Sequence, residues 1–254
     1  MKFDTAELEK MVDETPATEQ TRAFVDQLEA DNEVLFTASE QQIEAYYKSI
    51  TDKATLTKHF TGRMVNERMN LVEISKAISE MPATTSVKEL QLLSRQASDE
   101  AKHFKMVKEV IEHITGEEVD LQAAVDSWET RVKNKGASLI NEFDAHNDEI
   151  ALALYQMCAE GRAEAVWNQM AETIKDEFIS TRYAEIAKDE GFHSKIGAWK
   201  LEQLVETPEA QAHAAELVAK MRKELYRISC AGTKFVPEAK QLMEQAYDME
   251  IVIA

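Results

Sequence analysis

An Asp-Glu-x-x-His pattern occurs twice in the sequence, ninety residues apart, in SDEAKHFKM and AKDEGFHSK. The residues are Asp99, Glu100 and His103 in the first copy and Asp189, Glu190 and His193 in the second. A single Glu-x-x-His is common by chance and more often marks an exposed contact on one helix face. Two copies that both include the aspartate are expected only about once in a thousand such sequences. The repetition therefore indicates chemistry rather than coincidence.

Both copies fall on apolar stripes of predicted helices. The first stripe is Leu93, Ala97, Glu100, His103, Val107 and Val110, and the second is Ile179, Ile186, Glu190, His193 and Leu201. A carboxylate and an imidazole directed into a core need a compensating partner, because burying an unpaired charge is costly. Glu and His at i, i+3 can both reach one metal ion, so two such helices predict two ions.

Each ion needs further oxygen ligands from the neighbouring helix of its hairpin. Residues that face each other in an antiparallel hairpin are about equally far along the chain from the turn that connects the two helices. The midpoint of Glu67 and Glu100 falls at residues 83–84, within the turn after Pro82. Glu67 also lies on an apolar stripe, whereas Glu73 lies on a polar face. Glu67 is therefore the expected ligand, with Glu73 as the alternative.

The same reasoning selects Glu160, which precedes Glu190 by thirty residues and gives a midpoint at Lys175. Glu164 lies one turn further on the same face, either with a direct role or in a salt bridge to a nearby arginine. Asp99 and Asp189 are expected in the second shell, each accepting from the histidine of the opposite helix, since metal-bound histidines usually donate to a carboxylate.

Long helices are needed to position these groups, and the scarcity of breakers predicts them: the chain has seven glycines and four prolines. The expected helices cover 52–81, 86–115, 140–173, 176–204, 209–229 and 238–252, after acidic amphipathic segments within 1–50. Ser86 with Glu89 forms a capping box, and Gly116 is a C-terminal cap. Breaks are expected near Pro16 and at Lys135–Gly136, with a linking segment at 119–134. This is an all-α chain with two helical hairpins.

Composition excludes several classes of protein. A net charge of −18 disfavours nucleic-acid binding. No apolar run approaches the ~20 residues that span a membrane, and the acidic N-terminus lacks the apolar core of a signal peptide. Cys158 and Cys230 are expected to be free thiols, which indicates a cytoplasmic protein.

The set Glu67, Glu100, His103, Glu160, Glu190 and His193 resembles the ligands of the ferritin-like di-iron carboxylate superfamily, over about residues 60–204. IAKDEGFHSKIGAWKLEQL is similar to the last site helix of phenylacetyl-CoA epoxygenase subunits, and EGRAEAVWN to a helix of aldehyde-deformylating oxygenases. Val107 replaces the radical tyrosine of ribonucleotide reductase small subunits, and Glu164 replaces a threonine of multicomponent monooxygenases.

The resemblance implies a single ferritin-like domain over 1–254, with a four-helix bundle at about 52–204 and additional N- and C-terminal helices at 1–50 and 205–254. It implies a non-heme di-iron oxygenase, a monooxygenase or hydroxylase that uses O2 and two Fe ions, with Mn as the alternative metal. The substrate would be a small organic molecule, with Glu164 and Tyr183 in catalytic roles.

The implied partners are an electron-donating reductase or ferredoxin and a second copy of the chain in a homodimer. The alternatives within the same fold are a ferroxidase, a peroxidase or a dimanganese catalase. A helical scaffold that holds a metal only for stability is the alternative from a different class.

Overall fold

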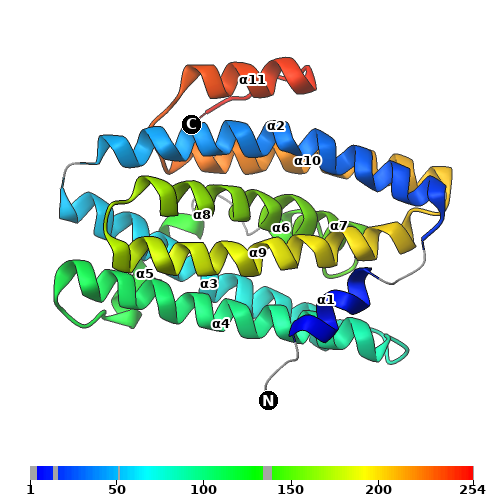
Figure 1. Ribbon diagram of the computed structural model, residues 1–254, viewed down its shortest axis with the longest axis horizontal. Helices are drawn as coiled ribbons and strands as arrows, with labels where there is room; N and C mark the ends of the chain where they lie inside the picture. Colours follow the sequence, from blue (N-terminus) through cyan, green and yellow to red (C-terminus); the bar gives the residue numbers. More distant parts are fainter. Residues whose placement is uncertain (1–4, 14–16, 51, 134–138, 254) are drawn as a thin grey trace. The chain divides into compact units, whose positions relative to one another are not determined.

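The computed structural model describes residues 5–13, 17–50, 52–133 and 139–253, and over these residues the chain is helical without a β-strand (Figure 1). The all-α prediction is confirmed. None of the helices in these ranges has the length and apolar character to cross a membrane. The predicted breaks near Pro16 and at Lys135–Gly136 lie outside the described residues.

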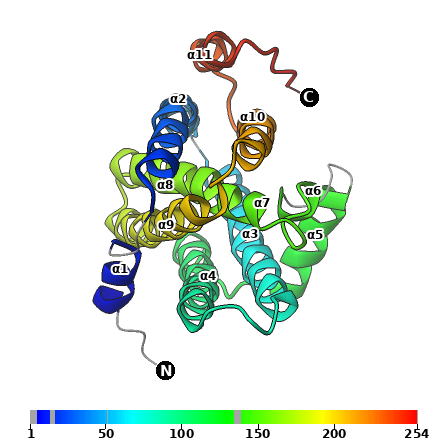
Figure 2. The same ribbon diagram turned by 90° about the vertical axis from the view of Figure 1, so that its right-hand side faces the viewer.

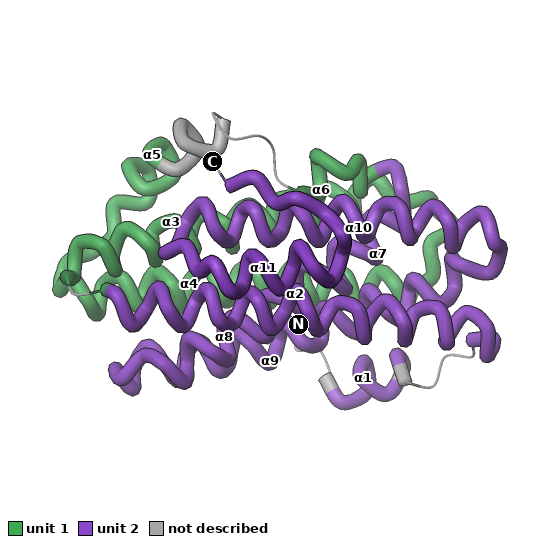
Figure 3. Tube along the Cα trace, turned by 90° about the horizontal axis from the view of Figure 1, so that it is seen from above, with its two compact units in different colours: residues 1–3, 50–146 green, residues 4–49, 147–254 purple. Residues whose placement is uncertain are grey.

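The chain forms two compact units (Figure 3). Unit 1 comprises Met1–Phe3 and Ile50–His146, and unit 2 comprises Asp4–Ser49 and Asn147–Ala254. Unit 1 is therefore almost entirely one continuous segment, whereas unit 2 is built from two distant segments. The single domain expected over 1–254 stays a prediction.

Unit 1 is a helical hairpin with two additions. Its helices are α3 (Lys53–Glu80), α4 (Val87–Thr115), α5 (Leu121–Lys133) and α6 (Leu139–Glu142). The first two pack against each other along their length, and α5 packs on α3 (Figure 2). The caps of α4 agree with the prediction: the Ser86 hydroxyl accepts from the Glu89 N–H at 3.1 Å, and Gly116 ends the helix with φ 77°.

Unit 2 contains the remaining helices of the described residues. These are α1 (Thr5–Asp13), α2 (Glu19–Ser49), α7 (Glu149–Tyr155), the π-helix η1 (Gln156–Glu160), α8 (Gly161–Thr173), α9 (Glu177–Leu204), α10 (Pro208–Ala231) and α11 (Pro237–Tyr247). Helix α2 packs on α8, α10 and α11, while α9 packs on α7, η1 and α8. Residues 151–163 are all buried, so α7 and η1 form the centre of this unit.

Three predicted boundaries differ from the structure. The helix expected from 140 begins only at Glu149, because Asp144 takes a left-handed conformation (φ 52°) and Asp148 caps the next helix. The linking segment expected at 119–134 contains α5. The last helix stops at Tyr247 because Asp248 is left-handed, with φ 46°.

The two glycines that end α4 and α10 allow a test of the left-handed backbone conformation at the end of α4. Gly116 has φ 77°, whereas Gly232 has φ −100°, and a Cβ at either position would meet nothing within 4 Å. We expect Gly116→Ala to lower the free energy of unfolding by about 1 to 2 kcal/mol, because an L-residue is strained in the left-handed region. Gly232→Ala is the matched control and should be near neutral. Urea unfolding of both variants measures the difference, and equal effects would contradict the assignment.

Candidate metal centres

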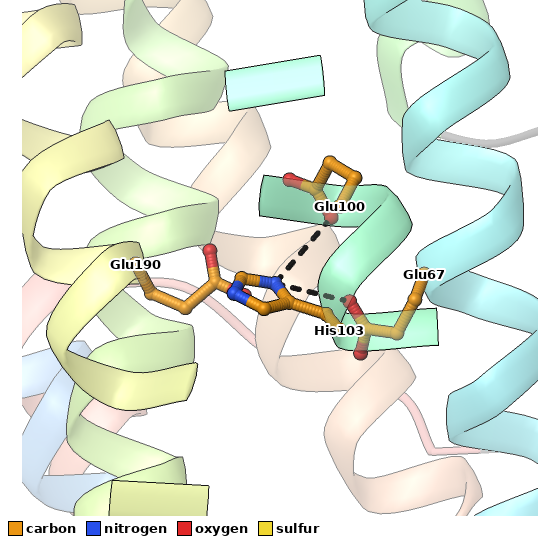
Figure 4. A group of neighbouring side chains, drawn as sticks. All are labelled: Glu67, Glu100, His103 and Glu190. Atoms are coloured by element: carbon orange, nitrogen blue, oxygen red, sulfur yellow. Dashed lines mark ion pairs between the residues drawn. The ribbon is translucent and has the colours of Figure 1, made fainter. Parts of the chain in front are cut away.

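Unit 1 encloses a group of two carboxylates and one imidazole, which we call the unit 1 triad: Glu67 from α3 with Glu100 and His103 from α4. All three side chains are buried, and their ligand atoms lie within 4.8 Å of one another. The His103 Nδ1 atom is 3.8 Å from Glu100 Oε2 and 3.9 Å from Glu67 Oε2. Figure 4 shows both carboxylates turned toward the imidazole ring.

Unit 2 encloses an equivalent group, the unit 2 triad: Glu160 from η1 with Glu190 and His193 from α9. These side chains are also buried, with ligand atoms within 4.8 Å of one another. The His193 Nδ1 atom is 2.9 Å from Glu190 Oε2. The structure thus brings together, three in each unit, the six residues that the sequence predicts as ligands.

The donor atoms of both triads fit a divalent metal ion. Ligand atoms that are each about 2.1 Å from one ion lie roughly 3 to 3.5 Å apart. The separation of 2.9 Å in the unit 2 triad lies at the short end of that range, and the separations of 3.8 and 3.9 Å in the unit 1 triad lie slightly beyond it. Two buried carboxylates with oxygens within 4.8 Å of each other repel when both are ionised, and a divalent cation offsets this repulsion. The i, i+3 spacing in α4 and in α9 aims both ligands from one helix face.

Glu73, the alternative to Glu67, belongs to a different contact. The His146 Nε2 atom is 2.8 Å from Glu73 Oε2, and its Nδ1 atom is 4.0 Å from Glu80 Oε2. Glu73 and Glu80 are two turns apart on α3, so His146 ties the end of unit 1 to this helix. The structure therefore places Glu67 with His103, and Glu73 with His146.

Glu164 lies half-buried on α8, against the backbone of α9 beside Glu190. A Cβ at Gly191 would lie 2.6 Å from the Glu164 carboxyl carbon, so a larger residue there would displace the carboxyl group from its place against α9. Burial raises the pKa of Glu164, the nearby Glu190 and Glu33 raise it further, and Lys195 opposes them. The carboxyl group therefore holds a proton more readily than an exposed glutamate.

The remaining predicted residues lie as follows. Asp99 pairs with Arg95 of its own helix, with 3.2 Å between Oδ2 and Nε. Asp189 is buried in α9, and Tyr183 is buried with its ring centroid 5.5 Å from that of Trp167. That the two aspartates accept hydrogen bonds from the metal-binding histidines, and that Tyr183 is catalytic, stay predictions.

Sequence reasoning missed the π-helix and the small residues that contact it. Glu160 is the last residue of η1, and π-turns within helices are frequent at functional sites. The signal was the pair of glycines inside α9, of which Gly197 packs against η1 and Gly191 against Glu164 of α8. An interior glycine costs a helix about 1 kcal/mol relative to alanine, so it usually marks close packing.

Neither cysteine has the properties of a catalytic nucleophile. Both Cys158 and Cys230 are free and buried. Burial raises the pKa of the Cys158 thiol from 9.0 to about 11, outweighing the opposing effects of Arg222 and of the hydrogen bond to Asn32. The reactive form of a cysteine is the thiolate, so this thiol is held in its inert form at neutral pH.

The fold is similar to that of a known crystal structure. This is a TenA homolog from Pseudomonas syringae pv. tomato, with a TM-score of 0.56 and 11% sequence identity over 89% of this chain and 93% of that chain. No protein-family model matches the sequence, and no curated protein matches it either. At this identity the similarity concerns the fold alone.

This similarity corrects the family assignment. The chain shares the fold of a TenA homolog, so its assignment to the ferritin-like di-iron carboxylate superfamily is wrong, and the ferritin-like form of the bundle is not confirmed. The oxygenase interpretation and its ferroxidase, peroxidase and catalase alternatives came from that superfamily and are corrected with it. The physical reason is that Glu-x-x-His determines which side chains share a helix face, and not how the helices connect.

The raised thiol pKa has a measurable consequence. In a Cys230→Ser variant, which isolates Cys158, we expect iodoacetamide to leave the folded protein unlabelled at about pH 8 and to label it after denaturation. The neutral thiol stabilises the folded state fully below pH 9, and this contribution is lost as the pH rises toward 11. Stoichiometric labelling of the folded protein at pH 8 would contradict the assignment.

Proposed function

We propose that the protein is a metal-dependent enzyme that binds one Fe(II) or Mn(II) ion at each of its two triads. The observation that carries this proposal is the burial of two carboxylates and one imidazole within 4.8 Å of one another in each unit. Two ionised carboxylates held this close together in an apolar core repel each other, and a divalent cation between them offsets a cost of several kcal/mol.

The ligand types support iron or manganese over other metals. Each triad offers carboxylate oxygens and one imidazole, which suit these ions, and the free cysteines lie outside both groups. Soft ions and structural zinc favour thiolate ligands. The proposal therefore names hard to borderline divalent ions rather than soft ions or a thiolate-bound structural zinc.

The types of ligand support a catalytic rather than a purely structural role. Catalytic metal ions are commonly held by imidazole and carboxylate ligands with one position left for water or substrate, and we propose that each triad leaves such a position. An ion held in this way supplies Lewis acidity to a water molecule or to an oxygen of a small organic substrate. Glu164, whose pKa is raised by burial, lies beside Glu190 and is the proposed proton donor.

Metal content tests the ligand assignment. We expect the anaerobically loaded protein to retain about two equivalents of Fe(II) or Mn(II) after gel filtration, and His103→Ala and His193→Ala to lose about one equivalent each, because each removes one of three ligands. His113→Ala is the matched control, since His113 is exposed on the same helix as His103. Retention of less than one equivalent by the unmodified chain would refute the proposal.

Nitric oxide tests the open coordination positions. Exposure of the anaerobic Fe(II) protein to nitric oxide should give the electron paramagnetic resonance signal of a high-spin ferrous nitrosyl species, because an open position admits the added ligand. A protein that holds two equivalents of Fe(II) but gives no such signal has closed sites. That result would favour the structural scaffold over the enzyme.

A further inference from the structure

The π-helix determines where Glu160 points. A π-turn adds one residue to a helical turn, so the side chains beyond it are rotated by about 100° from an uninterrupted α-helix. Glu160 is the last residue of η1, and the chain continues directly into α8 at Gly161. Because π-turns are rare within α-helices, we expect contacts from neighbouring residues to hold this one in place.

The residues in position to do so lie on the ligand-bearing face of α9. Glu190, His193, Ser194 and Gly197 occupy positions i, i+3, i+4 and i+7, which form one stripe on a helix. The first two belong to the unit 2 triad. The other two continue the same face by one turn, where α9 packs against η1.

Gly197 lets the two helices approach at backbone distance. A Cβ at this position would lie 2.5 Å from the Ala153 carbonyl oxygen and 2.6 Å from the Met157 amide nitrogen. Backbone atoms cannot rotate away as a side chain does, so any larger residue must displace α9 from the start of the π-helix. The close approach of η1 therefore leaves no room for a side chain larger than glycine at position 197.

Ser194 supplies a hydrogen bond from the same face. Its hydroxyl donates to the Met157 carbonyl oxygen at 3.2 Å, in the middle of the π-helix. A Cβ at Gly161, the residue after Glu160, would lie 2.9 Å from this hydroxyl oxygen. Ser194 therefore contacts the chain on both sides of Glu160.

We propose that Ser194 and Gly197 are positioning residues that hold η1 so that the Glu160 carboxylate completes the unit 2 triad. This inference rests on the proposed metal site. One face of α9 then has two roles: Glu190 and His193 bind the ion directly, and the next turn of the helix holds Glu160 in position. Neither positioning residue donates to the ion itself.

The test uses Mn(II) and a His103→Ala reference protein, so that binding reports on the unit 2 triad. We expect Ser194→Ala to weaken Mn(II) binding about tenfold and Gly197→Ala to weaken it up to about a hundredfold, as outer-shell changes at metal sites commonly do. In a Glu160→Gln background, measured at the higher Mn(II) concentrations that the weaker amide ligand requires, both effects should shrink, because the carboxylate that they position is absent. Ser194→Ala creates no overlap and remains informative if Gly197→Ala fails to fold.

Two variants serve as matched controls: Ser180→Ala removes a serine from α9 away from η1, and Gly232→Ala adds a Cβ where nothing lies within 4 Å. Both should leave Mn(II) affinity unchanged. The positioning role would be overturned if Ser194→Ala and Gly197→Ala weakened Mn(II) binding equally with and without the Glu160 carboxylate. It would also be overturned if neither variant changed the Mn(II) affinity. In either case the proposed metal site would stand, but without these two positioning residues. Absence of Mn(II) binding by the reference protein would overturn both proposals.

Discussion

The cost of burying ionisable groups is the constraint on which this structure depends. In each unit two carboxylates and an imidazole lie in the helical core, where water cannot solvate them. A core of this kind is stable only when the charges are compensated, and the short distances within each triad favour one small cation as the partner. The rest of each unit is arranged around this requirement, with α4 and α9 each providing two of the three groups.

Much of the fold was predictable because its signals are local. Ser86 and Gly116 mark the two ends of α4 through the hydrogen bonds and backbone angles that helix ends require. The choice of Glu67 over Glu73 needed only the geometry of an antiparallel hairpin, in which facing residues are equally distant from the turn. The structure places Glu67 beside His103 for that reason, and Glu73 beside His146.

The remaining features depend on tertiary contacts that a periodic pattern does not contain. The π-turn changes the register between Tyr155 and Gly161, yet every residue around it is buried, so no polar face reveals the change. Helix α7 begins later than the expected residue 140 because Asp144 takes a left-handed conformation, which no local sequence motif predicts. How the helices connect was also beyond a local pattern, and the fold therefore differs from the superfamily that Glu-x-x-His suggests.

The two-segment construction of unit 2 has a consequence for synthesis on the ribosome. Unit 1 is nearly continuous over Ile50–His146, so its contacts can form as soon as that stretch has emerged. The long helix α2 is made earlier, but its partners α8, α10 and α11 are made last. Its apolar face must therefore stay without these partners through about a hundred residues of elongation, and exposed apolar surface of this kind is prone to aggregation.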